Sequence, residues 1–261
     1  MARAFENCID IPVNRSEKPR EVGLNFAGDW GWGMNYVEGM LEAVGEYLDL
    51  VKLAVLTGRL MDREFVKRKV ALYNKHQVKV FPGGMTLEAA LICKKVEQFF
   101  DEAKDLGCSV VEVSESEVKM TPDTKLRLVE MAKERGFQVL VELGPHHPEE
   151  PFAPAHIIKL SQEFLRAGAW KIVLEGQVLL LMKPWQNQQA AEKFFRIADA
   201  VGVNNIIFEI GGNLKLAQWL VLNYGPDVSF GNIGRDRVMQ LEHIRRGLNY
   251  PETWFGKFAS L

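Results

Sequence analysis

The sequence is poor in cysteine, in net charge and in long apolar runs, and each shortage excludes a class of protein. Its three cysteines, Cys8, Cys93 and Cys108, are widely spaced and odd in number, so they fit neither a disulfide framework nor a zinc site. The 32 Lys and Arg residues nearly balance 34 Asp and Glu residues, whereas a nucleic-acid partner would require a basic face. No apolar run reaches the roughly 18–20 residues that span a bilayer, so no membrane partner is expected.

The remaining composition is that of an ordinary globular protein. Apolar residues make up 47% of the chain and charged residues 25%, which is typical of soluble folded domains. The N-terminal residues contain no apolar stretch followed by a cleavage site, so they are not expected to act as a signal peptide. Together these features predict a cytoplasmic protein.

Short β-rich segments recur eight times along the chain, and each is followed by an amphipathic helical pattern. Most of the expected strands are almost continuously apolar, as in 139–143 (VLVEL), which is typical of parallel strands covered on both faces. The expected strands are 22–28, 49–55, 78–81, 109–113, 137–143, 171–174, 205–208 and 227–230. The expected helices are 36–47, 62–76, 87–106, 122–135, 155–167, 188–201, 214–224 and 235–247.

This alternation predicts an α/β fold consisting of a single (β/α)8 TIM barrel. Eight units in 261 residues give about 33 residues each, close to the barrel average of roughly 250 residues in all. A doubly wound sheet would usually carry a G-x-G-x-x-G turn after its first strand, and 28–33 (GDWGWG) lacks that spacing. No Pro/Gly/Ser-rich linker interrupts 1–261, so we expect one domain, with 1–20 as an arm or a plug at the base of the barrel.

Acidic residues gather where a barrel enzyme places its active site, at the C-terminal ends of the strands. In order, the expected strand ends carry Asp29, Lys52, Gly83–Gly84, Glu112, Glu142, Glu175, Glu209 and Gly231–Asn232. A carboxylate that follows an apolar run is costly to bury unless it is paired, hydrogen-bonded or bound to a metal. A ring of such acids suits a hard divalent cation, and Mg²⁺ is the cofactor that it predicts.

Other roles remain open for these charged residues. Any single glutamate can instead be structural, bonding backbone amides or Lys52. Lys52 can neutralise the acids, and it can also bind a phosphate or carboxylate of a substrate. After the fifth expected strand, His146 could act as a general acid near neutral pH, whereas an exposed loop histidine is the alternative for His147.

Several segments, in this order and spacing, resemble the phosphosulfolactate synthase family. The first (17–31) resembles the family's first strand, which ends in Asp29, and the second (47–58) keeps an Asp-x-Val-Lys pattern that ends at Lys52. The others are 80–88 with its Gly-Gly turn, 109–115, 140–144, 172–176, 206–210 and 227–257. The resemblance covers nearly the whole chain. It implies a Mg²⁺-dependent carbon–sulfur lyase that adds sulfite to phosphoenolpyruvate, giving a phospho-sulfolactate, the first step of one route to coenzyme M.

The resemblance also assigns roles to individual residues. It implies that Glu112, Glu142, Glu175 and Glu209 bind the metal. Lys52 and His146 are implied as catalytic residues, with His146 standing where the family has a lysine that is suited to deliver a proton. Asp29, Gln177, Gly231 and Asn232 are expected to bind the substrate.

The sequence departs from the family pattern after the sixth expected strand. There Gln177-Val178-Leu179-Leu180 stands where the family has Arg-Glu-Ser-Gly, so a bidentate clamp for an anion is lost. The apolar loop 178–182 is either an interface in a homo-oligomer, which we expect this protein to form, or a lid over a less anionic substrate. A small anionic substrate is the first expectation. A different substrate, or a catalytically silent protein with the binding or stress-protective role suggested for plant relatives, is the alternative.

Overall fold

The structure, a computed structural model, describes residues 3–145 and 152–248, without the side chains of 177–179. His146 therefore lies outside the described residues, as does the end of the last segment of the resemblance. Within the described ranges, no helix combines the length and the apolar character that crossing a membrane requires.

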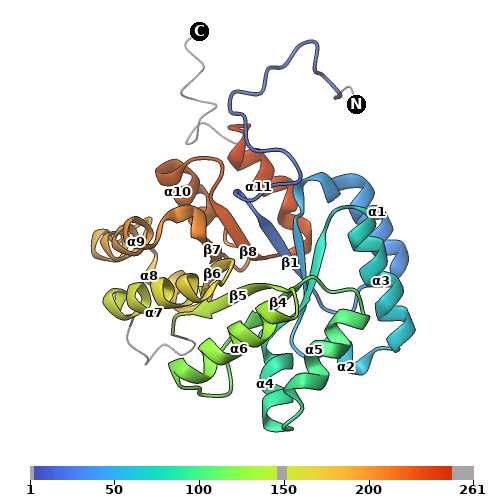
Figure 1. Cartoon of the computed structure of the whole chain (residues 1–261). Helices are drawn as coiled ribbons and strands as arrows, with labels where there is room; N and C mark the ends of the chain where they lie inside the picture. Colours follow the sequence, from blue (N-terminus) through green and yellow to red (C-terminus); the bar gives the residue numbers. More distant parts are fainter. Residues whose placement is uncertain (1–2, 146–151, 249–261) are drawn as a thin grey trace.

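Eight parallel strands alternate with helices and curl into a nearly closed barrel (Figure 1). The sheet order is β3-β2-β1-β8-β7-β6-β5-β4, and every described pair is parallel. The strands are β1 (Asn25–Asp29), β2 (Leu50–Leu53), β3 (Lys79–Pro82), β4 (Val110–Val113), β5 (Gln138–Leu143), β6 (Lys171–Leu174), β7 (Ile206–Glu209) and β8 (Ser229–Ile233). The expected (β/α)8 fold is confirmed.

The helices form the outer layer of the barrel. They are α1 (Met34–Val44), α2 (Thr57–Leu60), α3 (Arg63–Lys75), α4 (Gly84–Ile92), α5 (Val96–Asp105), α6 (Pro122–Glu134), α7 (Pro154–Ala167), α8 (Gly176–Met182), α9 (Gln188–Val201), α10 (Leu214–Tyr224) and α11 (Val238–Arg245). Short 3-10 turns are η1 (Gly45–Tyr47), η2 (Val203–Asn205) and η3 (Arg235–Arg237).

Besides the short additional helix α2 and the 3-10 turns, the helices differ from the sequence-based expectation in two places. The expected helix 87–106 is two helices, α4 and α5, because Lys94 adopts a left-handed backbone with φ of 55° that no α-helix continues. The apolar segment 178–182, expected as a loop, belongs to α8 instead. Both errors arise because an apolar pattern does not show where a helix begins or breaks.

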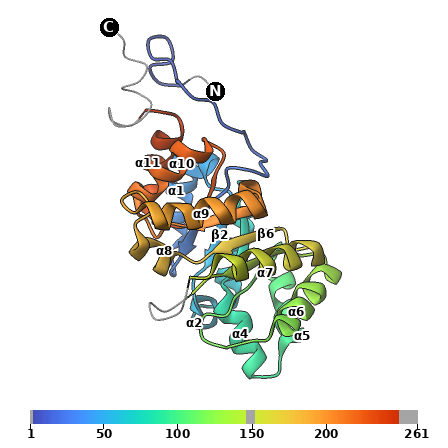
Figure 2. The same ribbon diagram turned by 90° about the vertical axis from the view of Figure 1, so that its left-hand side faces the viewer.

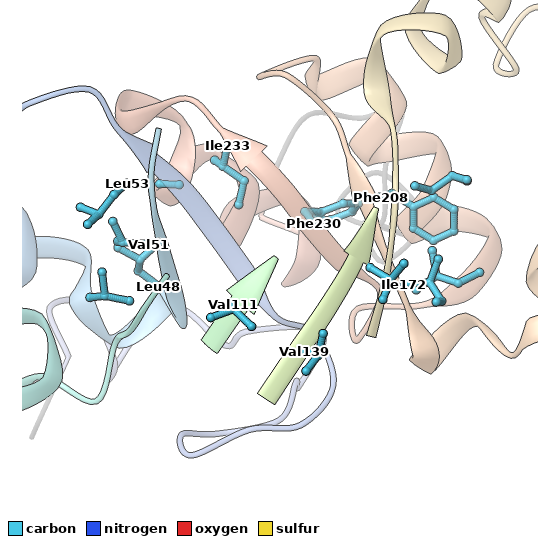
Figure 3. Packing of buried hydrophobic residues seen from close by; sticks show 14 of the residues in the cluster. Leu48, Val51, Leu53, Val111, Val139, Ile172, Phe208, Phe230 and Ile233 are labelled. Atoms are coloured by element: carbon cyan, nitrogen blue, oxygen red, sulfur yellow. The ribbon is translucent and has the colours of Figure 1, made fainter. Parts of the chain in front are cut away.

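Alternation along the strands separates two apolar layers. One layer fills the barrel and consists of Leu24, Phe26, Leu50, Phe81, Val110, Leu140, Val173 and Ile207. The other lies between the sheet and the helices, and Figure 3 shows strand residues that belong to it, among them Val51, Val111, Val139, Ile172 and Phe208. Since successive strand residues point to opposite faces, the residue two positions after an inward one also points inward.

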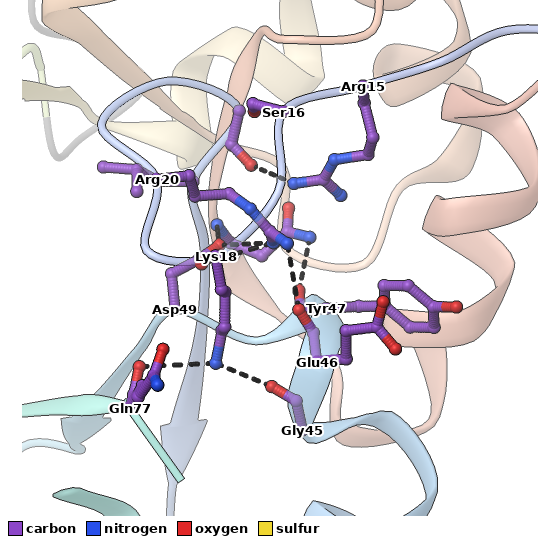
Figure 4. A network of polar contacts seen from close by, with 12 residues as sticks. Arg15, Ser16, Lys18, Arg20, Gly45, Glu46, Tyr47, Asp49 and Gln77 are labelled. Atoms are coloured by element: carbon purple, nitrogen blue, oxygen red, sulfur yellow. Dashed lines mark hydrogen bonds and ion pairs between the residues drawn. The ribbon is translucent and has the colours of Figure 1, made fainter. Parts of the chain in front are cut away.

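The N-terminal arm is tied across the base of the barrel by charged groups (Figure 4). Arg15, which is buried, pairs with Glu242, and Arg20 pairs with Asp49 at 3.3 Å. The ammonium of Lys18 donates to the backbone carbonyl of Gly45 at 2.7 Å. Figure 2 shows the arm, in dark blue, on the side of the barrel where α10 and α11 lie. These contacts attach the arm at the base, opposite the C-terminal ends of the strands.

Candidate active site at the mouth of the barrel

A cavity of about 630 Å³ opens at the C-terminal ends of the strands. Its floor consists of inward-facing residues that end five different strands. Lys52, Glu112, Glu142, Glu175 and Glu209 each lie two positions after an inward apolar residue, so strand alternation aims all five into the barrel. The sequence placed these residues at strand ends, and the structure brings them together.

Lys52 lies at the centre of three buried glutamates. Its Nζ is 3.0 Å from Glu112 Oε1, 3.3 Å from Glu209 Oε1 and 3.7 Å from Glu142 Oε2. One carboxylate oxygen from each glutamate lies within 4.8 Å of the others. The ammonium also lies 5.2 Å from the centre of the Phe26 ring, which forms part of the apolar filling below it.

Burial and mutual repulsion make the carboxylates of Glu142 and Glu209 reluctant to ionise. Burial raises the pKa of Glu209 to about 7, the charges of Glu175 and Glu112 add to this, and Lys52 opposes it. Burial, followed by the charges of Glu209 and Glu112, holds the pKa of Glu142 well above its ordinary value. Burial lowers the pKa of Lys52, but the facing carboxylates outweigh it and keep the ammonium charged. One lysine therefore leaves the cluster short of positive charge.

The donor set fits a hard divalent cation. Glu112 accepts a hydrogen bond from the Gly84 N–H at 2.7 Å through one oxygen. Its other oxygen is buried and accepts no hydrogen bond from any described residue, although Lys52 Nζ lies 3.0 Å away. Converging carboxylate oxygens, more numerous than one lysine can neutralise, are the kind of ligand that Mg²⁺ prefers.

Asp29 lies outside this cluster, although it ends a strand as the other acids do. Phe26 fills the barrel and Gly28 lines the cavity, so alternation turns Asp29 toward the helices. There its carboxylate is fully buried, 2.8 Å from Lys69 Nζ, and it accepts a hydrogen bond from the Tyr73 hydroxyl at 3.1 Å.

The same carboxylate also holds the loop that follows β1. Asp29 Oδ1 accepts hydrogen bonds from the backbone N–H groups of Gly31 at 2.8 Å and Trp32 at 2.7 Å. Both oxygens are therefore occupied by the protein itself. The geometry gives Asp29 a structural task, whereas the sequence predicted contact with the substrate.

Residues 13–250 match the family described as (2R)-phospho-3-sulfolactate synthase (ComA). The chain belongs to the phosphosulfolactate synthase family. It is 35% identical to a phosphosulfolactate synthase from Methanothermobacter thermautotrophicus over 90% of this chain and 92% of the relative. It is also 21% identical to protein HEAT-STRESS-ASSOCIATED 32 from Arabidopsis thaliana over 93% of this chain and 91% of that protein.

A solved structure supports the fold alone. The 3-hexulose-6-phosphate synthase from Salmonella typhimurium superimposes with a TM-score of 0.55 at 14% identity. The match covers 87% of this chain and all of that chain. The match to the family model confirms the family resemblance seen in the sequence, and the solved structure shows that the barrel is shared with more distant proteins.

Of the other residues expected to bind the substrate or to act in catalysis, Asn232 lines the cavity and Gly231 does not. Asn232 lines the cavity beside Ile233 and Gly234. Gly231 packs beneath them, because a Cβ at this position would lie only 2.4 Å from the Phe26 ring. The side chain of Gln177 and the whole of His146 lie outside the described part of the chain, so their roles stay predictions.

Sequence reasoning missed most of the apolar side chains that line the cavity. Trp30 and Trp32 follow β1, Val55 follows β2, and Met85 lies at the start of α4, after β3. Leu180, in the segment 178–182 that the sequence offered as a lid, lines the cavity from α8, after β6 on another side of the barrel. The signal that could have revealed part of this lining is the pair of glycine-flanked tryptophans directly after the first strand. Arg235, Ser114 and Ser116 also line the cavity and were not anticipated.

In metal-free buffer, the Glu209→Gln variant should be more stable than the wild type near pH 8. Between about pH 4.5 and pH 7, folded Glu209 keeps a proton that the unfolded chain has already released. Its ionisation therefore makes folding less favourable as the pH rises through this window, by on the order of 2–3 kcal/mol.

Urea unfolding of both proteins at a series of pH values measures this difference. It should be small near pH 4.5 and largest above pH 7. A variant that is less stable than the wild type at pH 8 would show that the Lys52–Glu209 ion pair outweighs the burial of the carboxylate.

Proposed function

We propose that this chain catalyses the Mg²⁺-dependent addition of sulfite to phosphoenolpyruvate, giving a phospho-sulfolactate, a reaction of the carbon–sulfur lyase class. The observation that carries the proposal is the cluster of Glu112, Glu142 and Glu209 around Lys52 at the floor of a cavity, in a chain of this family. The substrate is then a small anionic molecule, which matches the charge of the Lys52 ammonium.

The proposed reaction forms one bond and moves one proton. The sulfur lone pair of sulfite bonds to the methylene carbon of phosphoenolpyruvate, and the electrons of the double bond move toward the substrate carboxylate. A proton is then added to the adjacent carbon, and the phosphate stays in place. Bisulfite brings the proton that balances the equation.

Protein groups at the mouth are suited to these tasks. Lys52 offers a fixed positive charge to the substrate carboxylate or phosphate, and Arg235 offers another at the rim. His146, at the position of the family lysine, would deliver the proton. Glu112, Glu142, Glu175 and Glu209 would hold Mg²⁺, which when bound supplies positive charge where the substrate carboxylate gathers negative charge.

A second candidate is a reaction of the same kind on a less anionic substrate. Apolar side chains that line the mouth, among them Trp30, Trp32, Met85 and Leu180, favour it, because phosphoenolpyruvate and sulfite have no apolar part to place there. The replacement of the family arginine by Gln177 points in the same direction. A catalytically silent protein with a binding or stress-protective role is the remaining alternative, and the relative from Arabidopsis thaliana is named for heat stress. A catalytically silent protein would gain nothing from burying Glu112, Glu142 and Glu209 close together.

An excess of chelator should abolish product formation from sulfite and phosphoenolpyruvate, and saturating Mg²⁺ should restore it. Without the metal, the acidic cluster repels both anionic reactants. The variants Glu112→Gln and Glu175→Gln should each weaken Mg²⁺ binding by at least about tenfold while the barrel stays folded.

Phosphate-containing product can be followed by ³¹P NMR, and Mg²⁺ affinity by calorimetry. Chelator that is presaturated with Mg²⁺ is the control. Full activity in excess chelator would exclude the metal. Absence of product with both reactants, despite tight Mg²⁺ binding, would favour the second candidate.

The homo-oligomer expected from the sequence also remains a proposal. Leu181 on α8 is 63% exposed, next to the cavity-lining Leu180. An apolar side chain so exposed beside the mouth is suited to contact with a second copy. Light scattering of the wild type and of Leu181→Ser would test this.

A further inference from the structure

β3 and β4 are the edge strands of the sheet, and they lie side by side without strand pairing in the described chain. We call the line along which they meet the β3–β4 seam. At the mouth of the barrel, residues that follow β3 contact residues at and after the end of β4. The Gly84 N–H donates to Glu112, and a Cβ at Gly84 would lie 2.1 Å from Ser114 Oγ, so the backbone of α4 abuts the end of β4.

Glu88, one turn further along α4, makes four hydrogen bonds across this seam. Its Oε1 accepts hydrogen bonds from the Ser114 hydroxyl and from the Ser116 N–H at 2.9 Å. Its Oε2 accepts from the N–H groups of Glu117 and Val118, both at 2.8 Å. Both oxygens thus bind the loop that connects β4 to α6.

The charge of Glu88 is what holds this loop. The side chain is only 2% exposed, and burial by itself would favour the neutral acid. The Ser114 hydroxyl and the three backbone N–H groups overcome burial and hold the pKa of Glu88 below its ordinary value. Successive backbone N–H groups form a concave anion site, and here it is filled by a carboxylate of the chain itself.

The loop that Glu88 holds forms one side of the active-site cavity. Ser114, Ser116 and Glu117 line the cavity, whereas Glu88 is not among the described residues that line it. The hydroxyl of Ser116 lies 3.4 Å from Oε1 of Glu142, so the loop also contacts the acidic cluster. A shift of the loop would therefore change the shape of the cavity and the surroundings of Glu142.

We propose that Glu88 is a positioning residue for the reaction: its carboxylate bridges the β3–β4 seam and fixes loop 114–118 against the substrate cavity. The part that concerns turnover rests on the proposed function. The part that concerns the loop does not. Nothing in the sequence marks this glutamate, because it lies within a helix and not at a strand end.

The Glu88→Gln variant tests the proposal with two independent readouts. Glutamine keeps the shape but has one acceptor oxygen and an NH₂ group that faces N–H donors. Hydrogen exchange of the amides of Ser116, Glu117 and Val118 should become at least about tenfold faster. The kcat/KM for sulfite addition should fall about 10–100-fold, mainly through KM, because the loop lines the cavity while Lys52 stays in place.

Glu242→Gln is the matched control. Glu242 is also a buried carboxylate that accepts hydrogen bonds, from Arg15 and Arg246, but it lies at the base of the barrel. This variant should lose stability and leave both KM and the exchange of residues 116–118 unchanged. If Glu88→Gln does not fold, Ser114→Ala, which removes one of the four hydrogen bonds, should give smaller changes of the same sign.

The outcomes distinguish the role of Glu88 in fixing the loop from its role in turnover. Unchanged exchange at residues 116–118 in Glu88→Gln overturns the proposal, as does an equal loss of kcat/KM in Glu242→Gln. If the wild type forms no product, the proposed function fails, while the exchange experiment still decides whether Glu88 fixes the loop.

Discussion

Replacing Asp29 by asparagine should lower the free energy of unfolding by about 3–5 kcal/mol, because it leaves a buried lysine without its counter-charge. Lys69 is fully buried, and its Nζ lies 2.8 Å from Asp29 Oδ2. The Trp32 carbonyl also accepts a hydrogen bond from Lys69, at 3.0 Å, but a carbonyl does not neutralise an ammonium. Asparagine preserves the shape, removes the charge and replaces one acceptor oxygen by an NH₂ group that faces hydrogen-bond donors.

Urea unfolding followed by circular dichroism measures this loss. Asp62→Asn is the control, because Asp62 is an exposed aspartate that caps α3, the helix that carries Lys69, and asparagine caps helices equally well. Its stability should change little. An Asp29→Asn protein with unchanged stability and weakened substrate binding would instead support the direct substrate contact expected from the sequence.

Replacing His146 by alanine should lower turnover about 10²–10⁴-fold, the usual contribution of a positioned general acid, with little change in stability. The reason is chemical: the proposed addition of sulfite is complete only when a proton reaches the adjacent carbon, and His146 is predicted to stand where the family has a lysine suited to that step. Since imidazolium loses its proton near neutral pH, the wild-type rate should fall as the pH rises through that range.

His147→Ala is the matched control, and it should cost far less turnover. Single-turnover kinetics across pH 5.5–9 would compare the two variants with the wild type. If the two alanine variants behave alike, the correspondence between His146 and the family lysine is wrong. The proton would then come from Lys52 or from a metal-bound water.

Asp29 shows where sequence reasoning reached its limit at the site. Glu112, Glu142, Glu175 and Glu209 also follow apolar runs, and from the sequence all five acids look equivalent. Parallel strands covered on both faces are apolar at every position, so the sequence does not show which face a terminal residue takes. Pairing of the strands decides this, and it turns Asp29 toward Lys69.

Glu88 shows a different limit. Its partners, Ser114 to Val118, are 26 to 30 positions away along the chain. Within α4 it looks like any glutamate on a helix, and its burial is visible only once β3 and β4 are placed side by side. A long-range contact between a side chain and the backbone leaves no local pattern to read.

The sequence by itself determined the barrel, the family and the strand-end glutamates, because these depend on local features: apolar runs, helical periodicity and the residue that ends each run. Only the tertiary structure decided that Lys52 lies among three of these glutamates, that Asp29 faces outward and that Glu88 holds loop 114–118. The physical reason is that closure of the barrel brings distant strands together, and the burial, charge and pKa of each group depend on the neighbours that closure supplies.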